Sequence, residues 1–311
     1  MMKIGMIGMS PGNAHPYSWS AIINGCYNAE EIIKVGYPAV ANYLKANEDT
    51  LGVNGAKVTA VWTQDKGISE SIAKTTQIET IADNLEEMVS MVDAVIIARD
   101  DPQNHVAMAK PFIDANIPVF IDKPLAVSHE DLHYFSEQVS KGKLIMSCSS
   151  MRYSNECRII KQELSALGKL ELATAVGKKD WVKYGVHLLE ALFFLLDDTH
   201  PVTVKHVGKS GKDVVYIEFQ NGVIATLHLF MDISSTFQIS LFGREGWRIA
   251  DIKNSYSMFR DNIIEFLRSV DEGKARLPFK KTETIIKTLI GAIESREKGG
   301  EIIRLNQEPN K

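Results

Sequence analysis

Three residues that could meet a ligand, Asp122, Lys123 and Pro124, follow directly on the short apolar stretch 117–121. In a parallel sheet, the residues just past the carboxyl end of a strand face the crevice where ligands bind, and a proline fixes the backbone beside it. The amine of Lys123 would then be presented to a bound ligand. Taken alone, the same residues also fit a solvated turn, so the surrounding elements must decide.

Two more predicted strands end in residues that carry chemistry. The apolar stretch 93–98 runs into Arg99 and Asp100, and His105 follows where the next helix begins. The stretch 57–63 ends at Thr63 and is followed by Asp65 and Lys66, at the place where a Rossmann domain binds the adenosine ribose. An acid there favours NAD and a cation favours NADP. Both are present, so the choice stays open, with Asp65 favouring NAD.

The N-terminus predicts a strand over 3–9, a dense turn over 10–16 and a helix over 17–25. This order suits a dinucleotide, because glycines let the backbone approach the pyrophosphate and the helix N-terminus stabilises it. The fingerprint G-x-G-x-x-G is altered, since Ser10 and Asn13 stand at its second and third glycine positions and Gly12 comes one place early. Ser10 can still donate a hydrogen bond and Asn13 tolerates unusual backbone angles, so phosphate binding remains open.

Strand and helix patterns alternate from residue 1 to about 148, which predicts a doubly wound parallel sheet, a Rossmann domain. The stretch 26–56 is longer than a usual connection and is interpreted as an insertion that overhangs the ligand crevice or packs on the first helix. Residues 149–311 predict a second, α+β domain with an open, mainly antiparallel sheet, a hairpin turn at Asn221 and Gly222, and closing helices over 257–270 and 282–298.

Composition narrows the function. The chain has 311 residues with a formal net charge of -4, which suits two domains and gives no nucleic-acid footprint. Its cysteines, Cys26, Cys148 and Cys157, lie far apart without a C-x-x-C pair, so neither a disulfide framework nor a metal site is expected. No uninterrupted apolar run reaches the roughly 20 residues of a membrane helix, and the default expectation is a cytoplasmic protein that acts on a small molecule.

Several motifs follow one another along nearly the whole chain. They are K-I-G-M-I-G at 3–8, V-I-I-A at 95–98 followed by Pro102 and His105, D-K-P at 122–124, G-V-H at 185–187 with Glu190, and the stretch from Phe259 through Glu294 and Ser295 to Gly300. This ordered set resembles the glucose-fructose oxidoreductase / inositol dehydrogenase / MocA (Gfo/Idh/MocA) family, in which E-K-P stands in place of D-K-P. The resemblance implies a Rossmann domain joined to an α/β domain whose open sheet forms dimer or tetramer contacts, and NAD(P)-linked oxidation or reduction of sugars and polyols.

Matched residue by residue, Lys123 corresponds to the family's active-site lysine and His187 to its histidine. A neutral imidazole near pH 7 can remove the hydroxyl proton while hydride leaves for the nicotinamide, and Lys123 would stabilise the charge that develops on the same oxygen. The catalytic candidates are Lys123, His187, Lys183 and Tyr184. The cofactor-binding candidates are Gly8, Ser10, Gly12, Asn13, Thr63, Asp65, Arg99, Asp100, His105, Asp122 and Lys123.

The chain departs from the family pattern at Lys183, where many members have an aspartate four residues before the histidine. A second cation near Lys123 would depress the pKa of one or both amines or suit an anionic substrate, such as a carboxylated or phosphorylated sugar. Tyr184 could donate a proton in compensation. Asp180 could reach His187 if the residues 181–184 form a loop.

Three functions are open at this point. The first is a nicotinamide-dependent oxidoreductase acting on a sugar or sugar derivative. The second is a dinucleotide-binding sensor or assembly protein without turnover, motivated by Lys183 and the altered glycine loop. The third is a lyase or glycoside hydrolase that recycles a bound NAD.

Overall fold

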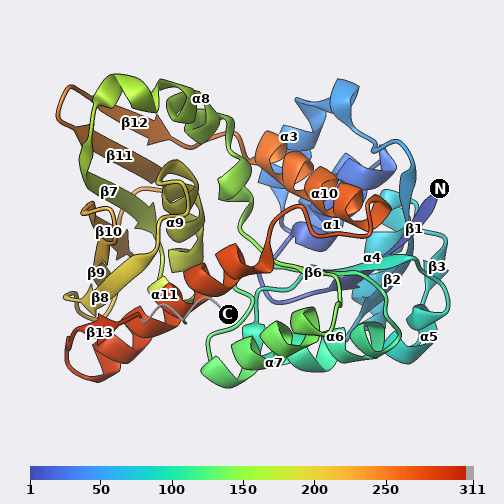
Figure 1. Ribbon diagram of the computed structural model, residues 1–311. Coiled ribbons are helices and arrows are strands. Elements are labelled where there is room, and N and C mark those ends of the chain that lie inside the picture. The colour runs from blue at the N-terminus through green and yellow to red at the C-terminus, as the bar shows by residue number, and fades with distance from the viewer. Residues whose placement is uncertain (306–311) are drawn as a thin grey trace. The chain divides into compact units, whose positions relative to one another are not determined.

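The computed structural model describes residues 1–305 (Figure 1), which fold into two compact units of several segments each. Unit 1 contains residues 1–126, 133–147 and 259–279. Unit 2 contains residues 127–132, 148–258 and, within the described part of the chain, 280–305. The units differ from the expected division at residue 148 because 127–132 belongs to unit 2 and 259–279 returns to unit 1.

Unit 1 is built on a six-stranded sheet, all parallel, in the order β3-β2-β1-β4-β5-β6. The central strands are apolar along their length because helices cover both faces of such a sheet. The strands are β1 (Met2–Gly8), β2 (Ala56–Thr63), β3 (Thr80–Ile81), β4 (Ala94–Ile97), β5 (Val119–Ile121) and β6 (Ile145–Met146). The helices are α1 (His15–Asn24), α4 (Lys66–Thr76), α5 (Leu85–Val89), α6 (His105–Asp114), α7 (His129–Ser140), which begins in unit 2, and α10 (Ser255–Asp271), most of which lies in unit 1.

The strand register shows which helices cover which face of this sheet. Phe120 of β5 contacts Trp19 of α1 and Phe266 of α10, with ring centroids 5.7 and 5.6 Å apart. Gly5 of β1 is in register with Val95 of β4 and, through it, with Val119, the residue before Phe120. Gly5 therefore faces the other side, where a Cβ would lie 2.7 Å from the sulfur of Met88 in α5. Helices α1 and α10 therefore cover one face of the sheet, and α5 covers the other.

The insertion over 26–56 forms two short helices within unit 1, α2 (Ala29–Lys34) and α3 (Pro38–Lys45). Tyr43 of α3 donates its hydroxyl proton to Ser18 of α1, and the backbone N–H of Asn28 donates to the carbonyl of Thr75 in α4 at 2.9 Å. The insertion therefore packs on α1 and α4, which is the second of the two placements expected from the sequence.

Unit 2 is built on a seven-stranded mixed sheet in the order β12-β11-β7-β10-β9-β8-β13, antiparallel except for the β7–β10 pair. Asn221 and Gly222 form the predicted hairpin turn between β9 and β10, with a φ of 87° at Gly222. The strands are β7 (Leu170–Lys178), β8 (Pro201–His206), β9 (Lys212–Phe219), β10 (Ile224–Phe230), β11 (Phe237–Gly243), β12 (Trp247–Asp251) and β13 (Ile303–Arg304); the helices are α8 (Asn155–Glu163), α9 (Trp181–Leu195) and α11 (Phe279–Glu297).

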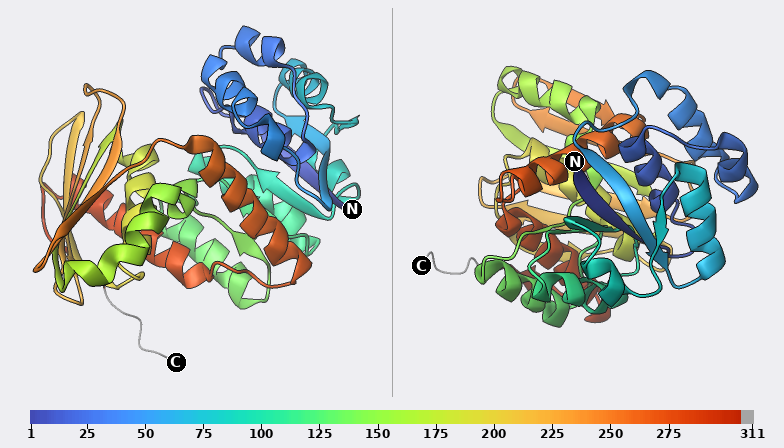
Figure 2. Two further views of the ribbon diagram at one scale, coloured as in Figure 1. Left: turned by 90° about the horizontal axis from the view of Figure 1, so that it is seen from above. Right: turned by 90° about the vertical axis from the view of Figure 1, so that its right-hand side faces the viewer.

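Buried and accessible residues alternate along β9 and β10, as expected for a sheet with one face on a core. The left view of Figure 2 shows α9 and α11 together on one side of this sheet. The predicted fold class, a parallel Rossmann sheet followed by an α+β part with a mainly antiparallel sheet, is confirmed. Among residues 1–305, no helix combines the length and the apolar character needed to cross a bilayer.

Candidate active site

Three strands of unit 1 bring Ser10, Asp100 and Lys123 together at their carboxyl ends. The hydroxyl of Ser10 donates to Asp100 Oδ1 at 2.5 Å, and Lys123 Nζ lies 3.8 Å from Asp100 Oδ2. All three are buried, with 1, 8 and 5% of their surface exposed. The sequence places these residues 90 and 23 positions apart, and the parallel sheet unites them because β1, β4 and β5 end at one edge.

Asp122 organises the loop after β1. Its Oδ2 accepts from Asn13 Nδ2 at 3.0 Å and lies 2.6 Å from His15 Nδ1, while Oδ1 accepts from the backbone N–H of Lys123 at 2.8 Å. Burial by itself would raise the pKa of this carboxyl, but the charges of His15 and Lys123 and the hydrogen bonds outweigh burial and hold its pKa well below the usual value. Asp122 is therefore an ionised anchor for the glycine loop.

This depressed pKa predicts a stability that depends on pH. Protonating Asp122 costs more in the folded than in the unfolded chain, so its contribution is complete above the ordinary aspartate pKa of about 4 and is lost as pH falls through the lower folded pKa. We expect the free energy of unfolding, measured with urea at a series of pH values, to fall less steeply in acid for Asp122→Asn than for the wild type. Asp114→Asn, which removes an exposed carboxylate on α6, is the control. Identical acid slopes for Asp122→Asn and the wild type would contradict the assignment.

The turn between β1 and α1 has the features that a dinucleotide pyrophosphate requires. A Cβ on Gly8 would lie 2.5 Å from Cγ of Pro16, so only glycine allows the strand to pass this close to the helix. Gly12 has a φ of 79° in the left-handed region. At the N-terminus of α1, Asn13 Oδ1 accepts from the backbone N–H of His15 at 2.9 Å, and the N-cap Ala14 adds no side-chain hydrogen bond. The positive end of the helix suits an anion. The backbone of residues 8–15 therefore fits a dinucleotide pyrophosphate. The side chains of Ser10 and Asn13 donate hydrogen bonds to Asp100 and Asp122.

The end of β2 differs from the expected ribose site in one respect. Asp65 is the N-cap of α4, and its Oδ1 accepts from the backbone N–H of Ile68 at 3.2 Å. Nearby, Arg99 forms a two-pronged ion pair with Asp101, at 2.8 and 2.5 Å, and donates to Oε1 of Gln64 at 2.6 Å. The positive charge of Arg99 is therefore neutralised by Asp101, two residues along the same loop.

Two of the residues predicted to bind the cofactor, Thr63 and His105, make hydrogen bonds to backbone carbonyl groups of unit 1. Thr63 Oγ1 donates to the carbonyl of Asp65 at 2.5 Å. The ring nitrogens of His105, which is fully buried, lie 3.0 Å from the carbonyl oxygens of Leu125 and Arg99. His105 therefore joins the loops that follow β4 and β5, and its role in cofactor binding stays a prediction.

In unit 2 the candidate side chains lie on the first two turns of α9 (Trp181–Leu195). The helix begins at Trp181 because Asp180 caps it, with Oδ1 accepting from the backbone N–H of Lys183 at 3.0 Å. The loop over 181–184 that would let Asp180 serve His187 is thus absent, and its carboxylate is used by the helix end. Tyr184 and His187, three residues apart, lie on one face of the helix with ring centroids 5.2 Å apart.

Phe237 and Lys179 complete this aromatic group. The ring of Phe237 stacks near Tyr184 at 6.3 Å and meets His187 edge-on at 5.8 Å. Lys179 lies over the Tyr184 ring, with Nζ 4.3 Å from its centroid, and donates a hydrogen bond to the tyrosine oxygen. Tyr184, His187 and Phe237 are half-buried, so one side of the group remains accessible in unit 2.

Ser149 fixes the ring of His187. Its Oγ lies 2.6 Å from His187 Nδ1 and accepts from the backbone N–H of Met151 at 3.2 Å. Ser149 is fully buried, and its Oγ shares one hydrogen bond with His187 Nδ1, whose direction depends on the tautomer of the imidazole. This contact orients the ring and involves Nδ1, so Nε2 is the ring nitrogen that Ser149 does not contact.

A network of ion pairs around the buried Arg152 holds the backbone of Ser149 in place. Arg152 donates to Glu190 at 2.6 Å and to Asp198 at 2.7 Å, and Lys281 lies 2.7 Å from Asp198. Oε1 of Glu190 accepts from the backbone N–H of Ser149 at 3.2 Å. Since Glu190 and His187 share α9, this network ties the helix to the loop that orients the imidazole.

Comparison with known proteins finds a family match for the N-terminal segment. The model of the oxidoreductase family with an NAD-binding Rossmann fold, Gfo/Idh/MocA, matches residues 2–149. Over these residues, the chain is similar to the Gfo/Idh/MocA oxidoreductases. The matched segment contains every candidate cofactor ligand from Gly8 to Lys123, and the resemblance drawn from the motifs is confirmed.

One curated relative and several solved structures extend the comparison. Inositol 2-dehydrogenase 1 of Saccharopolyspora erythraea is 35% identical over 107 residues, which are 33% of this chain and 32% of that enzyme. The structure of scyllo-inositol dehydrogenase from Lactobacillus casei, with bound NAD(H) and scyllo-inositol, has a TM-score of 0.75 at 13% identity and covers 97% of this chain and 98% of its own. Myo-inositol 2-dehydrogenase from Lactobacillus plantarum has 0.75 at 15%, covering 98% and 99%. At these identities the structures show a shared fold.

Sequence reasoning missed three residues of the two clusters: His15, Ser149 and Lys179. Ser149 had a usable signal, since it directly follows the end of the alternating strand and helix pattern at about residue 148. His15 lies in the predicted turn and Lys179 just before the helix cap. Their partners lie 107 and 5 residues away, and no spacing rule links them.

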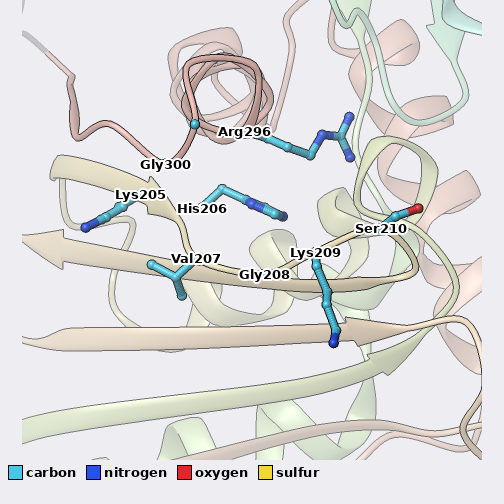
Figure 3. A pocket seen from close by; sticks show the side chains of 9 residues that line it. Lys205, His206, Val207, Gly208, Lys209, Ser210, Arg296 and Gly300 are labelled. Carbon is cyan, nitrogen blue, oxygen red and sulfur yellow. The ribbon is translucent and has the colours of Figure 1, made fainter.

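A separate pocket of about 420 Å³ lies in unit 2 (Figure 3). Its lining is basic, but Lys205 and Lys209 point away from each other in Figure 3. His206 and Arg296 both pair with the buried Asp213, at 2.8 and 3.5 Å. The second oxygen of Asp213 accepts from the backbone N–H of Trp181, so this network holds the start of α9. The lining residues are Lys205, His206, Val207, Gly208, Lys209, Ser210, Arg296, Gly299 and Gly300.

Proposed function

We propose that this chain is an NAD-dependent oxidoreductase that transfers a hydride between nicotinamide and a hydroxyl or keto carbon of a sugar or cyclic polyol. The observation that carries the proposal is the buried cluster in which Lys123 lies 3.8 Å from Asp100, at the strand ends of a Rossmann sheet whose family binds NAD. Lys123 is buried at this edge of the sheet and lies close to a carboxylate. This environment supports a ligand-binding role for the amine over the alternative of a solvated turn.

The residues of the chain would bind the reacting oxygen and manage its proton. Lys123 donates a hydrogen bond to this oxygen and stabilises the negative charge that develops on it. In unit 2, His187 offers Nε2 to a substrate hydroxyl, because its Nδ1 is held by Ser149. NAD, when bound, supplies the carbon that accepts or gives the hydride. The N-terminus of α1 and the loop over 8–15 would hold its pyrophosphate.

The substrate class follows from the polar and aromatic groups on α9. Tyr184, His187 and Phe237 offer rings and hydrogen-bonding atoms of the kind that bind polyhydroxylated rings. The relatives named above are inositol dehydrogenases, and inositols are the first compounds to test. Lys179 and Lys183 flank the group with two cations, which favours a substrate or product with an acidic substituent. Uronates and other acidic sugars form the second set.

NAD is the preferred cofactor. A 2′-phosphate on the ribose requires a cation near the end of β2, and Arg99 is neutralised there by Asp101. Asp65, one residue further along than Gln64, adds a negative charge beside the ribose position, whereas Lys66 is exposed at the start of α4. The balance disfavours the phosphate of NADP.

A binding titration followed by a turnover assay tests the function. NADH and NADPH are titrated separately, with nicotinamide fluorescence and energy transfer from tryptophan as readouts. We expect NADH to bind at least about tenfold more tightly than NADPH, a difference of about 1.4 kcal/mol. Inositols and acidic sugars are then screened for reduction of NAD. Failure of both cofactors to bind, in reduced and oxidised forms, would reject the oxidoreductase.

The two alternative functions give different results in the same assays. A sensor or assembly protein would bind NADH and show no hydride exchange with any compound. A lyase or glycoside hydrolase with a recycled cofactor would release product without net reduction of added NAD. The intact Lys123 cluster favours the oxidoreductase over both.

We also propose that a second copy of the chain covers the open face of the seven-stranded sheet. The register aligns one apolar row across four strands, and its members are 37–59% exposed. Such a continuous apolar row on a sheet is typical of an interface. The row consists of Ile224, Leu172, Phe242 and Trp247.

A further inference from the structure

We infer that Asp101 sets the cofactor specificity of this chain by keeping Arg99 in an ion pair, so that this arginine cannot bind a phosphate on the 2′-oxygen of the adenosine ribose. The inference rests on the proposed function and refines its cofactor preference. It assigns the discrimination to the loop after β4, whereas the sequence pattern favoured NAD because of Asp65 after β2.

The position of Arg99 is the first step. In unit 1, β1 lies between β2 and β4, and Arg99 comes two residues after β4 (Ala94–Ile97). Its Nη1 donates to Oε1 of Gln64 at 2.6 Å, and Gln64 directly follows β2. An arginine near the end of β2 is the residue type that accommodates the 2′-phosphate of NADP. The guanidinium of Arg99 therefore lies at the end of β2, where a 2′-phosphate would require a cation.

The anchoring of Gln64 is the second step. Its Nε2 donates to the carbonyl of Met9 at 2.6 Å, and its Oε1 accepts from the backbone N–H of Met9 at 3.1 Å. Two hydrogen bonds thus hold the side-chain amide against the loop that follows β1. Because Arg99 donates to this amide, its guanidinium is held close to the turn that would bind the pyrophosphate.

The pairing of Arg99 with Asp101 is the third step. The two carboxylate oxygens accept from Nε and Nη2 of Arg99 at 2.8 and 2.5 Å, the two-pronged geometry that makes such pairs strong. Asn104 Nδ2 donates to the same carboxylate at 2.6 Å. Burial by itself would raise the pKa of Asp101, but the hydrogen bonds from Arg99 and Asn104 outweigh burial and lower this pKa. The carboxylate is therefore ionised at neutral pH.

The shielding of this pair decides against NADP. Only 7% of the Arg99 side chain and 14% of the Asp101 side chain are exposed, and all three guanidinium nitrogens have partners. A 2′-phosphate would have to displace the Asp101 carboxylate and would then meet its charge at close range. NAD carries a hydroxyl at this position and needs no cation.

Asp65 is the weaker discriminator of the two carboxylates. It is exposed, and its Oδ1 accepts from the backbone N–H of Ile68 at the start of α4. Water and salt screen an exposed charge of this kind. The main repulsion toward a 2′-phosphate therefore comes from Asp101.

Cofactor binding by Asp101→Asn in the full-length protein tests the inference without turnover. The amide keeps the size of the side chain and one acceptor oxygen, but it leaves the charge of Arg99 unpaired. NADPH, titrated by nicotinamide fluorescence, is expected to bind about tenfold more tightly than to the wild type, because Arg99 can then donate to the phosphate. NADH affinity is expected to change by less than about threefold. Unchanged NADPH affinity in a folded Asp101→Asn would overturn the inference.

Matched variants identify the charges responsible. Asp65→Asn removes the same charge, keeps a good helix cap and is expected to change NADPH affinity by less than about threefold. Adding Arg99→Met to Asp101→Asn is expected to abolish the gain. Adding Lys66→Met, which removes an exposed lysine at the start of α4, is expected to leave it. A gain that survives Arg99→Met, or that Asp65→Asn produces in full, would overturn the inference.

The salt dependence of the wild type decides the question even where Asp101→Asn does not fold. An unpaired cation facing the 2′-phosphate would make NADPH affinity fall more steeply with salt than NADH affinity, because salt screens the attraction. We expect the ratio of NADPH to NADH affinity not to fall between about 20 and about 500 mM NaCl. A falling ratio would overturn the inference, as would a wild type that prefers NADPH.

The outcomes separate the inference from the proposed function. A wild type that reduces NAD with a polyol leaves the function standing whatever Asp101→Asn does. A wild type that binds neither cofactor rejects the function and the inference together.

Discussion

Replacing Lys123 with methionine is expected to lower kcat by about 10²–10³-fold, the usual effect of removing one donor to a developing oxyanion. Methionine keeps the apolar stem of the side chain, so the packing at the end of β5 changes little. The carboxylate of Asp100 loses its cation but keeps the hydroxyl of Ser10. Steady-state kinetics with NAD and the best polyol measures the effect, and NADH fluorescence checks that the cofactor still binds.

Two further variants make the Lys123 result specific. Lys141→Met removes an exposed lysine paired with Glu137 at the end of α7, and its activity is expected to equal that of the wild type. Lys123→Arg keeps the charge but replaces the compact ammonium with a planar fork, so it is expected to recover little of the lost kcat. Normal turnover by Lys123→Met would end the proposed mechanism.

Replacing Arg152 with methionine is expected to reduce the free energy of unfolding by about 3–5 kcal/mol, because the change leaves buried carboxylates without their cation. Arg152 is 4% exposed and Glu190 is 1% exposed, so water cannot replace the lost contacts. Lys281 still pairs with Asp198, which leaves Glu190 as the uncompensated charge. Urea denaturation of the wild type and the variant, followed by tryptophan fluorescence, measures the difference.

The comparison for Arg152 is a solvent-exposed ion pair in the same unit. Arg248 lies 2.5 Å from Glu163 with 40 and 46% of the two side chains exposed. Arg248→Met is expected to change the free energy of unfolding by less than about 1 kcal/mol. If Arg152→Met and Arg248→Met both lower the free energy of unfolding by the same small amount, the ion network around Arg152 does not stabilise the fold as proposed. A second effect is expected at 25 °C, where a surviving Arg152→Met protein should have a raised KM because Ser149 is less well held.

The sequence by itself determined the fold class and one half of the site. Apolar strands alternating with helices are local patterns, and a parallel sheet places every strand end at one edge. Lys123 and Asp100 could therefore be assigned to one place, although 23 residues separate them. The Asn221–Gly222 turn was equally readable, because left-handed backbone angles restrict the residue type. The order of the motifs along the chain then indicated a resemblance to the Gfo/Idh/MocA family.

The tertiary structure decided the partners of these residues. Whether Asp65 and Asp180 bind a ligand or cap a helix depends on where the helix begins, and the sequence pattern leaves that boundary uncertain by a few residues. His15 reaches Asp122 across 107 positions, and Ser149 reaches His187 across 38. Hydrogen bonds act over about 3 Å and depend on direction, so residue spacing cannot predict them. The sequence therefore identified the chemical groups, and only the folded chain determined which atoms donate and which accept.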